Sequence, residues 1–118
     1  MSEIPEIPEI PEIPEIPNNP SWIYHYARAT QKRWLEAEPT ILTDPAWAYR
    51  YAKDIIQGRW SESELILLTS PIWAYRYALN VLKDRWPEAE SIILQSEFAK
   101  YYCKEFLQAK TNWQKEGF

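Results

Sequence analysis

Residues 45–52 read Pro-Ala-Trp-Ala-Tyr-Arg-Tyr-Ala, and residues 71–78 read Pro-Ile-Trp-Ala-Tyr-Arg-Tyr-Ala. An earlier copy at residues 20–27 reads Pro-Ser-Trp-Ile-Tyr-His-Tyr-Ala, and a degenerate copy at residues 96–103 reads Ser-Glu-Phe-Ala-Lys-Tyr-Tyr-Cys. The motif therefore returns every 25 or 26 residues. A period of this length is typical of stacked supersecondary units.

A second motif follows each of the first three octapeptides and ends in an aliphatic run. It reads Arg-Trp-Leu-Glu-Ala-Glu at residues 33–38, Arg-Trp-Ser-Glu-Ser-Glu at 59–64 and Arg-Trp-Pro-Glu-Ala-Glu at 85–90. The two motifs predict a long and a short helix per unit. We therefore expect an all-α fold, a short α-solenoid or compact stack of about 3.5 helix pairs, with units 20–44, 45–70, 71–95 and 96–118 forming one domain, 20–118.

Capping signals place the helix boundaries. Asn19, Asp44 and Ser70 each precede a proline, which suits an N-cap followed by proline at the first helical position, and Ser61 with Glu64 has the spacing of a capping box. Trp and Tyr stand four residues apart in each long helix, so Trp47 and Trp73 are predicted to be equivalent buried residues. The expected helices are 20–32, 36–42, 45–58, 62–69, 71–84, 88–95 and 97–110.

Residues 1–19 are set apart by composition, because five Glu-Ile-Pro triplets run from Glu3 to Pro17. Proline at every third position predicts a polyproline II helix with glutamates on one edge and isoleucines on another. A semi-rigid spacer is the simplest interpretation. The apolar edge also suggests a docking strip, within one chain or between chains of a homo-oligomer, formed by Glu6, Ile7, Glu9, Ile10, Glu12 and Ile13.

Charge and cysteine content exclude several functions. The net charge is -4, but five acids lie in the tail, which leaves 13 basic and 12 acidic residues elsewhere. This balance argues against an acidic DNA mimic and against a basic surface for non-specific nucleic-acid binding. Cys103 is the only cysteine, so neither a disulfide within the chain nor a cysteine metal site is expected. No membrane span or secretory signal is visible, and we expect a cytoplasmic protein, in the host cytoplasm if it is phage-encoded.

The repetition argues against an enzyme, because an active site needs one asymmetric set of residues. His25, the only histidine, holds the position of Arg50 and Arg76, and we interpret it as a surface cation. Cys103 replaces an alanine and is expected to be a small buried residue. The three arginines that precede tryptophan, Arg33, Arg59 and Arg85, are expected to stack on Trp and pair with Glu. We predict no catalytic residue, no cofactor and no metal.

One column of residues has the composition of a binding face, since Tyr and Arg are common at interface hot spots. The third residue after each long-helix aromatic, together with the tyrosine before it, points away from the apolar stripe. The candidate partner-binding residues are Tyr24, His25, Tyr49, Arg50, Tyr75, Arg76 and Tyr101. The alternative is a solvated surface on which tyrosines half cover the seams between units.

The combination Trp-Ala-Tyr-Arg-Tyr-Ala, Arg-Trp-Pro-Glu-Ala-Glu and Ile-Ile-Leu resembles short helical repeats of uncharacterised bacteriophage, bacterial and giant-virus proteins, over roughly residues 20–108. The resemblance implies a helical-repeat fold and no particular reaction. The favoured hypothesis is a non-enzymatic protein–protein interaction module, such as an inhibitor or a scaffold component. The alternative is a nucleic-acid-binding repeat protein that uses the Tyr and Arg column.

Overall fold

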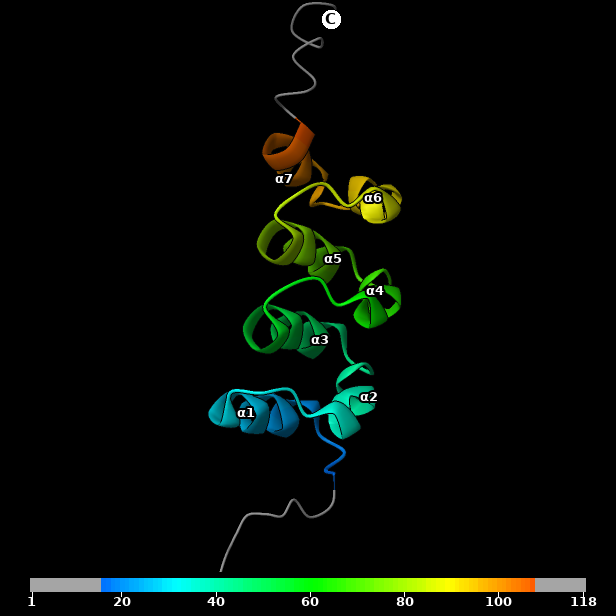
Figure 1. Ribbon diagram of the computed structural model, residues 1–118. Helices are drawn as coiled ribbons and strands as arrows, with labels where there is room; N and C mark the ends of the chain where they lie inside the picture. The colour runs from blue at the N-terminus through cyan, green and yellow to red at the C-terminus, as the bar shows by residue number, and fades with distance from the viewer. Residues whose placement is uncertain (1–15, 108–118) are drawn as a thin grey trace, which may run out of the picture.

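The chain folds as a stack of helices in two columns (Figure 1). The structure is a computed structural model that describes residues 16–107. The predicted polyproline II helix, with tail candidates Glu6 to Ile13, and the last part of the predicted helix 97–110 lie outside these residues. One column holds α1, α3, α5 and α7, and the other holds α2, α4 and α6.

Each unit supplies one helix to each column, apart from the last. The long-motif helices are α1 (Pro20–Thr30), α3 (Pro45–Tyr51), α5 (Pro71–Tyr77) and α7 (Ala99–Tyr102). The second helices are α2 (Glu38–Ile41), α4 (Ser61–Leu67) and α6 (Pro87–Leu94), and a short 3₁₀ turn, Leu35–Ala37, precedes α2. Residues 16–107 contain no strand, so the predicted all-α stack of helix pairs is confirmed.

Three of the long helices continue as a widened π-helical turn, over Ala52–Ile56, Ala78–Leu82 and Cys103–Leu107. The residues that end the first three long helices, Gln31, Gln57 and Lys83, have left-handed φ values of 59°, 62° and 56°. This conformation stops the helix, and the amide of Gln57 donates to the carbonyl of Ala52 at 2.7 Å. The predicted ends at residues 32, 58 and 84 are therefore two residues late.

Two of the predicted N-caps are confirmed. The side chain of Asn19 accepts a hydrogen bond from the amide of Trp22 at 3.1 Å, and that of Asp44 accepts one from Ala46 at 2.9 Å. Ser70 precedes α5 but makes no side-chain cap. The capping box at Ser61 is wrong, because Ser61 is already the first residue of α4 and Glu64 bonds to other partners, described below.

Small residues and large rings alternate in the core. Ala48, Ala52, Ala74 and Ala78 are fully buried, which lets successive long helices approach closely. Of the tryptophans, Trp60 and Trp86 are buried, at 2% and 1% exposure, whereas Trp47 and Trp73 are only partly buried against the core. The prediction that Trp47 and Trp73 are buried is thus wrong, since both rings keep part of their surface exposed.

The buried indoles carry a cost. The Nε1 atoms of Trp60 and Trp86 have no hydrogen-bond partner among the described residues. A buried donor of this kind costs about 1–3 kcal/mol, which the burial of the large ring offsets. Cys103 is only partly buried, unlike the fully buried alanines at the same position in other units.

In residues 16–107, no helix has the length and apolarity needed to cross a membrane.

Candidate interaction surface

The units are joined by a hydrogen-bonded clamp that recurs three times. In each joint the amide of the second-motif tryptophan donates to the hydroxyl of a tyrosine in the next unit. The bonds run from Trp34 to Tyr51 at 2.9 Å, from Trp60 to Tyr77 at 2.8 Å and from Trp86 to Tyr102 at 2.8 Å.

The same tyrosine hydroxyl then donates to the last glutamate of the second motif. These bonds are 2.8 Å to Glu38, 2.8 Å to Glu64 and 2.7 Å to Glu90. An arginine holds each carboxylate with two parallel bonds of 2.7–2.9 Å, in the pairs Arg33–Glu38, Arg59–Glu64 and Arg85–Glu90. The predicted pairing of these arginines with glutamate is confirmed.

The clamp sets the ionisation of its own groups. Burial raises the pKa of Tyr102 to about 12, and its hydrogen bond to Glu90 acts in the same direction. Burial likewise raises the pKa of Tyr51 and of Tyr77 well above the ordinary value. The hydrogen bonds from Arg85 lower the pKa of Glu90, against the opposing effect of burial. The polar atoms of these residues are thus bonded to one another and join neighbouring units.

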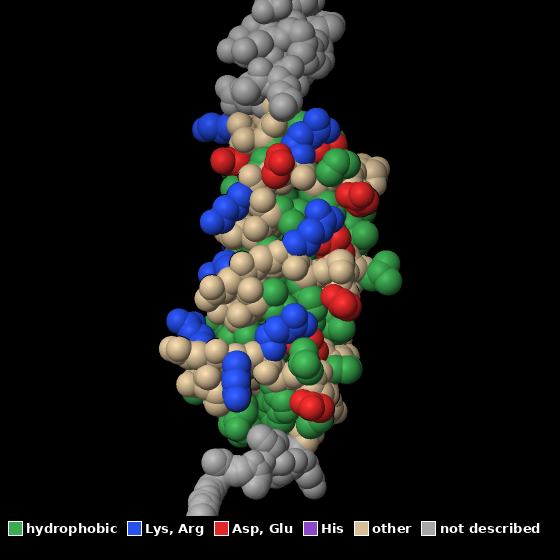
Figure 2. Space-filling view, viewed as in Figure 1, with side chains coloured by type: hydrophobic (Ala, Val, Ile, Leu, Met, Phe, Trp, Pro, Cys, Tyr) green, Lys and Arg blue, Asp and Glu red, His purple; other side chains and the backbone are tan. Residues whose placement is uncertain are grey.

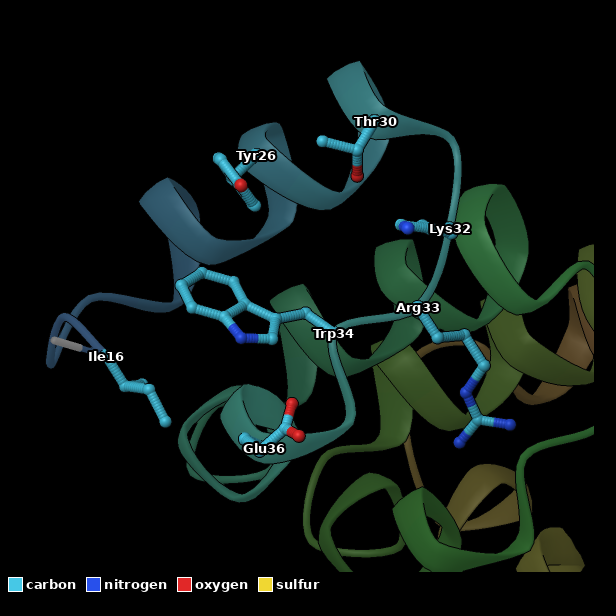
Figure 3. Close-up of a pocket in the computed structure, with 7 residues that line it drawn as sticks. All are labelled: Ile16, Tyr26, Thr30, Lys32, Arg33, Trp34 and Glu36. Atoms are coloured by element: carbon cyan, nitrogen blue, oxygen red, sulfur yellow. The ribbon is translucent and has the colours of Figure 1, made fainter. Parts of the chain in front are cut away.

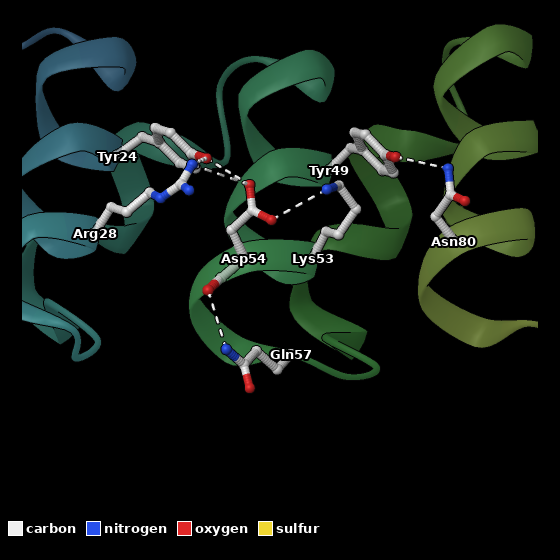
Figure 4. A network of polar contacts seen from close by, with 7 residues as sticks. All are labelled: Tyr24, Arg28, Tyr49, Lys53, Asp54, Gln57 and Asn80. Atoms are coloured by element: carbon white, nitrogen blue, oxygen red, sulfur yellow. Dashed lines mark hydrogen bonds and ion pairs between the residues drawn. The ribbon is translucent and has the colours of Figure 1, made fainter.

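A second set of polar contacts crosses the seams between long helices (Figure 4). The hydroxyl of Tyr24 donates to Asp54 in the next unit and accepts from Arg28 at 3.0 Å. Burial would raise the pKa of Asp54, but the bonds from Tyr24 and Lys53 lower it overall. One unit further on, the side chain of Asn80 donates to the hydroxyl of Tyr49 at 2.8 Å. Both tyrosine hydroxyls are therefore occupied inside the protein.

Cations lie over the partly exposed tryptophan rings of α3 and α5. The guanidinium of Arg50 lies 4.7 Å from the ring centre of Trp47 and 5.8 Å from that of Trp73, and Arg76 lies 5.0 Å from Trp73. The ring of His25 meets Trp47 edge-on at 6.0 Å. The arginines that stack on tryptophan are thus those of the long helices, whereas stacking was predicted for the arginines of the clamp.

We call the row formed by His25, Trp47, Arg50, Trp73, Arg76 and Tyr101 the ladder face. His25, Arg76 and Tyr101 are exposed, and the other three are partly exposed. Figure 2 shows Lys and Arg side chains repeating along the stack, while most acidic side chains lie over the column of second helices. Because guanidinium groups lie over tryptophan rings in it, the ladder face offers apolar rings and positive charge together.

The structure divides the predicted partner-binding residues into two groups. Tyr24 and Tyr49 are only 4% and 5% exposed, and Tyr75 is partly buried against Phe98, with ring centres 6.1 Å apart. The interpretation of these tyrosines as exposed members of the column is wrong for Tyr24 and Tyr49, because the next unit covers them. His25, Arg50, Arg76 and Tyr101 stay accessible.

Sequence reasoning missed two features of this surface. The tryptophan three residues before each arginine belongs to the ladder face, and that spacing places the two side chains on one side of a helix. The seam partners Asp54 and Asn80 stand 30 and 31 residues after their tyrosines. Because they differ in type between units, the repeat pattern did not mark them.

Within residues 16–107, no group of three His, Cys, Asp or Glu side chains is arranged to hold a metal ion. Comparisons of the whole chain with protein-family models, with curated proteins and with solved structures find no match.

Proposed function

We propose that this protein is a non-enzymatic interaction module that docks a partner protein on the ladder face. The observation that carries the proposal is the stacking of Arg50 and Arg76 on partly exposed tryptophan rings in successive units. Trp, Tyr and Arg are the residues most enriched among binding hot spots. Their repetition would let a partner make the same contact more than once.

The stacking also lowers the cost of binding. A long arginine side chain loses rotamer freedom when it is fixed at an interface, by about 0.5–1.5 kcal/mol. Arg50 lies within reach of two rings and so is partly ordered before any partner arrives. The partner expected is a protein surface with carboxylates beside apolar groups, which would face the guanidinium groups and the indoles.

Protein is favoured over nucleic acid because of where the tyrosines lie. A base-stacking ladder would need Tyr24 and Tyr49 as open platforms, and both are buried. A partner-bound module of this kind would act as an inhibitor or as a scaffold component, in the cytoplasm of a host cell if phage-encoded.

Affinity capture from the native cells, followed by mass spectrometry, tests the proposal. Wild-type protein should recover a stoichiometric protein partner, and the double variant Arg50→Glu, Arg76→Glu should lose it. Lys83→Glu, Lys104→Glu is the matched control, because it makes the same change in charge at two exposed cations outside the ladder face. Circular dichroism should show that both variants keep the helical fold.

Two results would contradict the proposal. One is recovery of nucleic acid alone, with no protein in stoichiometric amount. The other is equal recovery of the partner by wild type and by the variant at Arg50 and Arg76, which would show that the partner binds elsewhere.

A further inference from the structure

At the N-terminal end of the stack, a tyrosine stands at the clamp position, but residues 16–107 contain no preceding unit that could complete the clamp. Tyr26 is the counterpart of Tyr51, Tyr77 and Tyr102, each of which bonds to a tryptophan amide and a glutamate of the unit before it. Within residues 16–107, the Tyr26 hydroxyl makes no hydrogen bond to protein. In the described part of the chain, the joint at this end is therefore incomplete.

The rings around Tyr26 are uncovered as well. Trp22 stacks on Tyr26 with ring centres 5.5 Å apart, and Trp34 lies 4.9 Å from Tyr26 and 6.3 Å from Trp22, so the three rings form one cluster. Trp22 is 49% exposed. Its counterparts Trp47 and Trp73 are each covered by a tyrosine of the preceding unit, at 5.3 and 5.5 Å. Three aromatic rings thus form an end face that interior units would bury.

A hollow of about 560 Å³ opens beside these rings (Figure 3). Its walls include Ile16, Tyr26, Lys32, Arg33, Trp34 and Glu36, so aromatic rings, two cationic side chains and one carboxylate line it. A smaller hollow of about 330 Å³, lined by Trp22 and His25, shares Tyr26. Ile16 is the first residue that the structure describes, so the Glu-Ile-Pro repeats join the domain at the edge of the larger hollow.

We propose that the Glu-Ile-Pro tail of the same chain covers this end face and takes the place of the missing unit. Glutamates recur at every third position before Ile16, so a carboxylate is available to accept from the Tyr26 hydroxyl, as Glu38, Glu64 and Glu90 do at the interior joints. The intervening isoleucines supply the apolar surface that the three rings lack. Lys32 complements the charge of the acidic tail, whereas Glu36 has the same charge as the tail.

A second copy of the chain fits this face less well. The interior joints need Arg-Trp and a glutamate four residues after the tryptophan, whereas the C-terminal sequence has Asn112, Trp113 and Gly117 at those positions. In the last unit, Lys100 stands at the position of the seam tyrosines Tyr24 and Tyr49, and in the first unit Ala29 stands at the position of their partners Asp54 and Asn80. Head-to-tail stacking would thus form neither the clamp at Tyr26 nor a seam bond.

The tryptophans of the stack provide a test in the full-length protein. Cys103→Ala removes the only thiol and restores the residue that other units carry, and Pro11→Cys then accepts a nitroxide label without changing any tail glutamate or isoleucine. Relaxation enhancement of the indole N–H signals reports the position of the label. We expect strong broadening of Trp22 and Trp34, and sharp signals for Trp73 and Trp86.

Two further variants test the chemistry of the contact. Tyr26→Phe removes only the hydroxyl. The double variant Glu12→Gln, Glu15→Gln removes the two tail charges that are nearest to the helical domain in sequence. Each change should reduce the broadening of the Trp22 and Trp34 signals several-fold. The matched controls, Tyr101→Phe and Glu3→Gln, should leave it unchanged. The proposal is overturned if Trp22 and Trp34 stay sharp in the labelled wild type, or if Trp47 and Trp73 broaden most. It is also overturned if broadening appears between labelled and ¹⁵N-enriched chains in a mixed sample, since the tail would then bind a neighbour.

Discussion

In each joint of the stack, a single tyrosine hydroxyl bridges two neighbouring units. Tyr51, Tyr77 and Tyr102 were placed from the sequence on an apolar stripe, and all three are fully buried. The pattern did not predict that their hydroxyls bridge two units, because an apolar stripe identifies a buried ring and says nothing of its polar atom. Each second motif also carries a pair of glutamates, for which the sequence predicted the capping box at Glu64 and pairing with arginine, but no bond to a tyrosine. The second member of each pair is the acceptor of the clamp.

Tyr77→Phe should destabilise the protein by about 1–3 kcal/mol, because it leaves the buried amide of Trp60 without its acceptor. Equilibrium unfolding in urea gives the free energy. Tyr101→Phe is the control and should change it little, since that side chain is 50% exposed. Equal stability of wild type and Tyr77→Phe would show that the clamp contributes nothing.

Acid should weaken the last joint through Glu90. Its pKa is lowered in the folded state by the hydrogen bonds from Arg85, so its contribution is complete above the ordinary value of 4.5 and disappears as the pH falls through the folded pKa. Glu90→Gln should therefore be less stable than wild type at neutral pH, and this gap should narrow below about pH 4.5. Urea unfolding at several pH values measures the gap, and a gap independent of pH would contradict the assignment.

At the scale of the element, helix starts were easier to predict than helix ends. Proline after a capping residue marks the start of α1, α3 and α5, and each begins at that proline. The ends carry no glycine signal, because Gln31, Gln57 and Lys83 take the left-handed position where glycine is usual. No sequence feature predicted the π-helical turns that precede two of these ends, at Gln57 and Lys83.

Lys83→Gly should stabilise the protein by up to about 1 kcal/mol, because a side chain in the left-handed region is strained and glycine is not. Thermal unfolding would show the gain as a higher melting temperature. Lys83→Ala keeps the Cβ atom and should bring no gain, which separates relief of backbone strain from loss of charge. A melting temperature that rises equally in both variants would refute the argument from strain.

At the scale of the whole molecule, the repeat predicted the order and pairing of the helices. It did not predict which sides of the helices are buried between units and which are exposed. Helical periodicity placed Tyr24 and Tyr49 outside the apolar stripe, yet neighbouring units cover them. An apolar stripe identifies one buried side of a helix. A helix in an interior unit of a stack, however, contacts a neighbouring unit on each of two sides. The ladder face is consequently narrower than the sequence indicated, and richer in tryptophan.

Alkali should loosen the entire stack, because all three clamp tyrosines have a raised pKa. Their contribution is complete below the ordinary value of 10.0 and is lost as the pH rises through the folded value, about 12 for Tyr102. We expect the free energy of unfolding to fall between those pH values, and to fall less in Tyr102→Phe. Denaturant titrations at stepwise higher pH test this, and an identical decline in both proteins would contradict it.

Each clamp takes its residues from two neighbouring units, and these residue types are the same at every joint. One unit can therefore be removed, and its two neighbours can form the clamp with each other. Removing residues 45–70 would join Asp44 directly to Pro71, so that Tyr77 would meet the amide of Trp34 and the carboxylate of Glu38. Tyr24 would meet Asn80 in place of Asp54, and an amide can serve that hydroxyl as it serves Tyr49. The shortened chain should fold cooperatively as seen by circular dichroism. Recombination between gene segments can thus lengthen or shorten this protein without altering any residue at the junction.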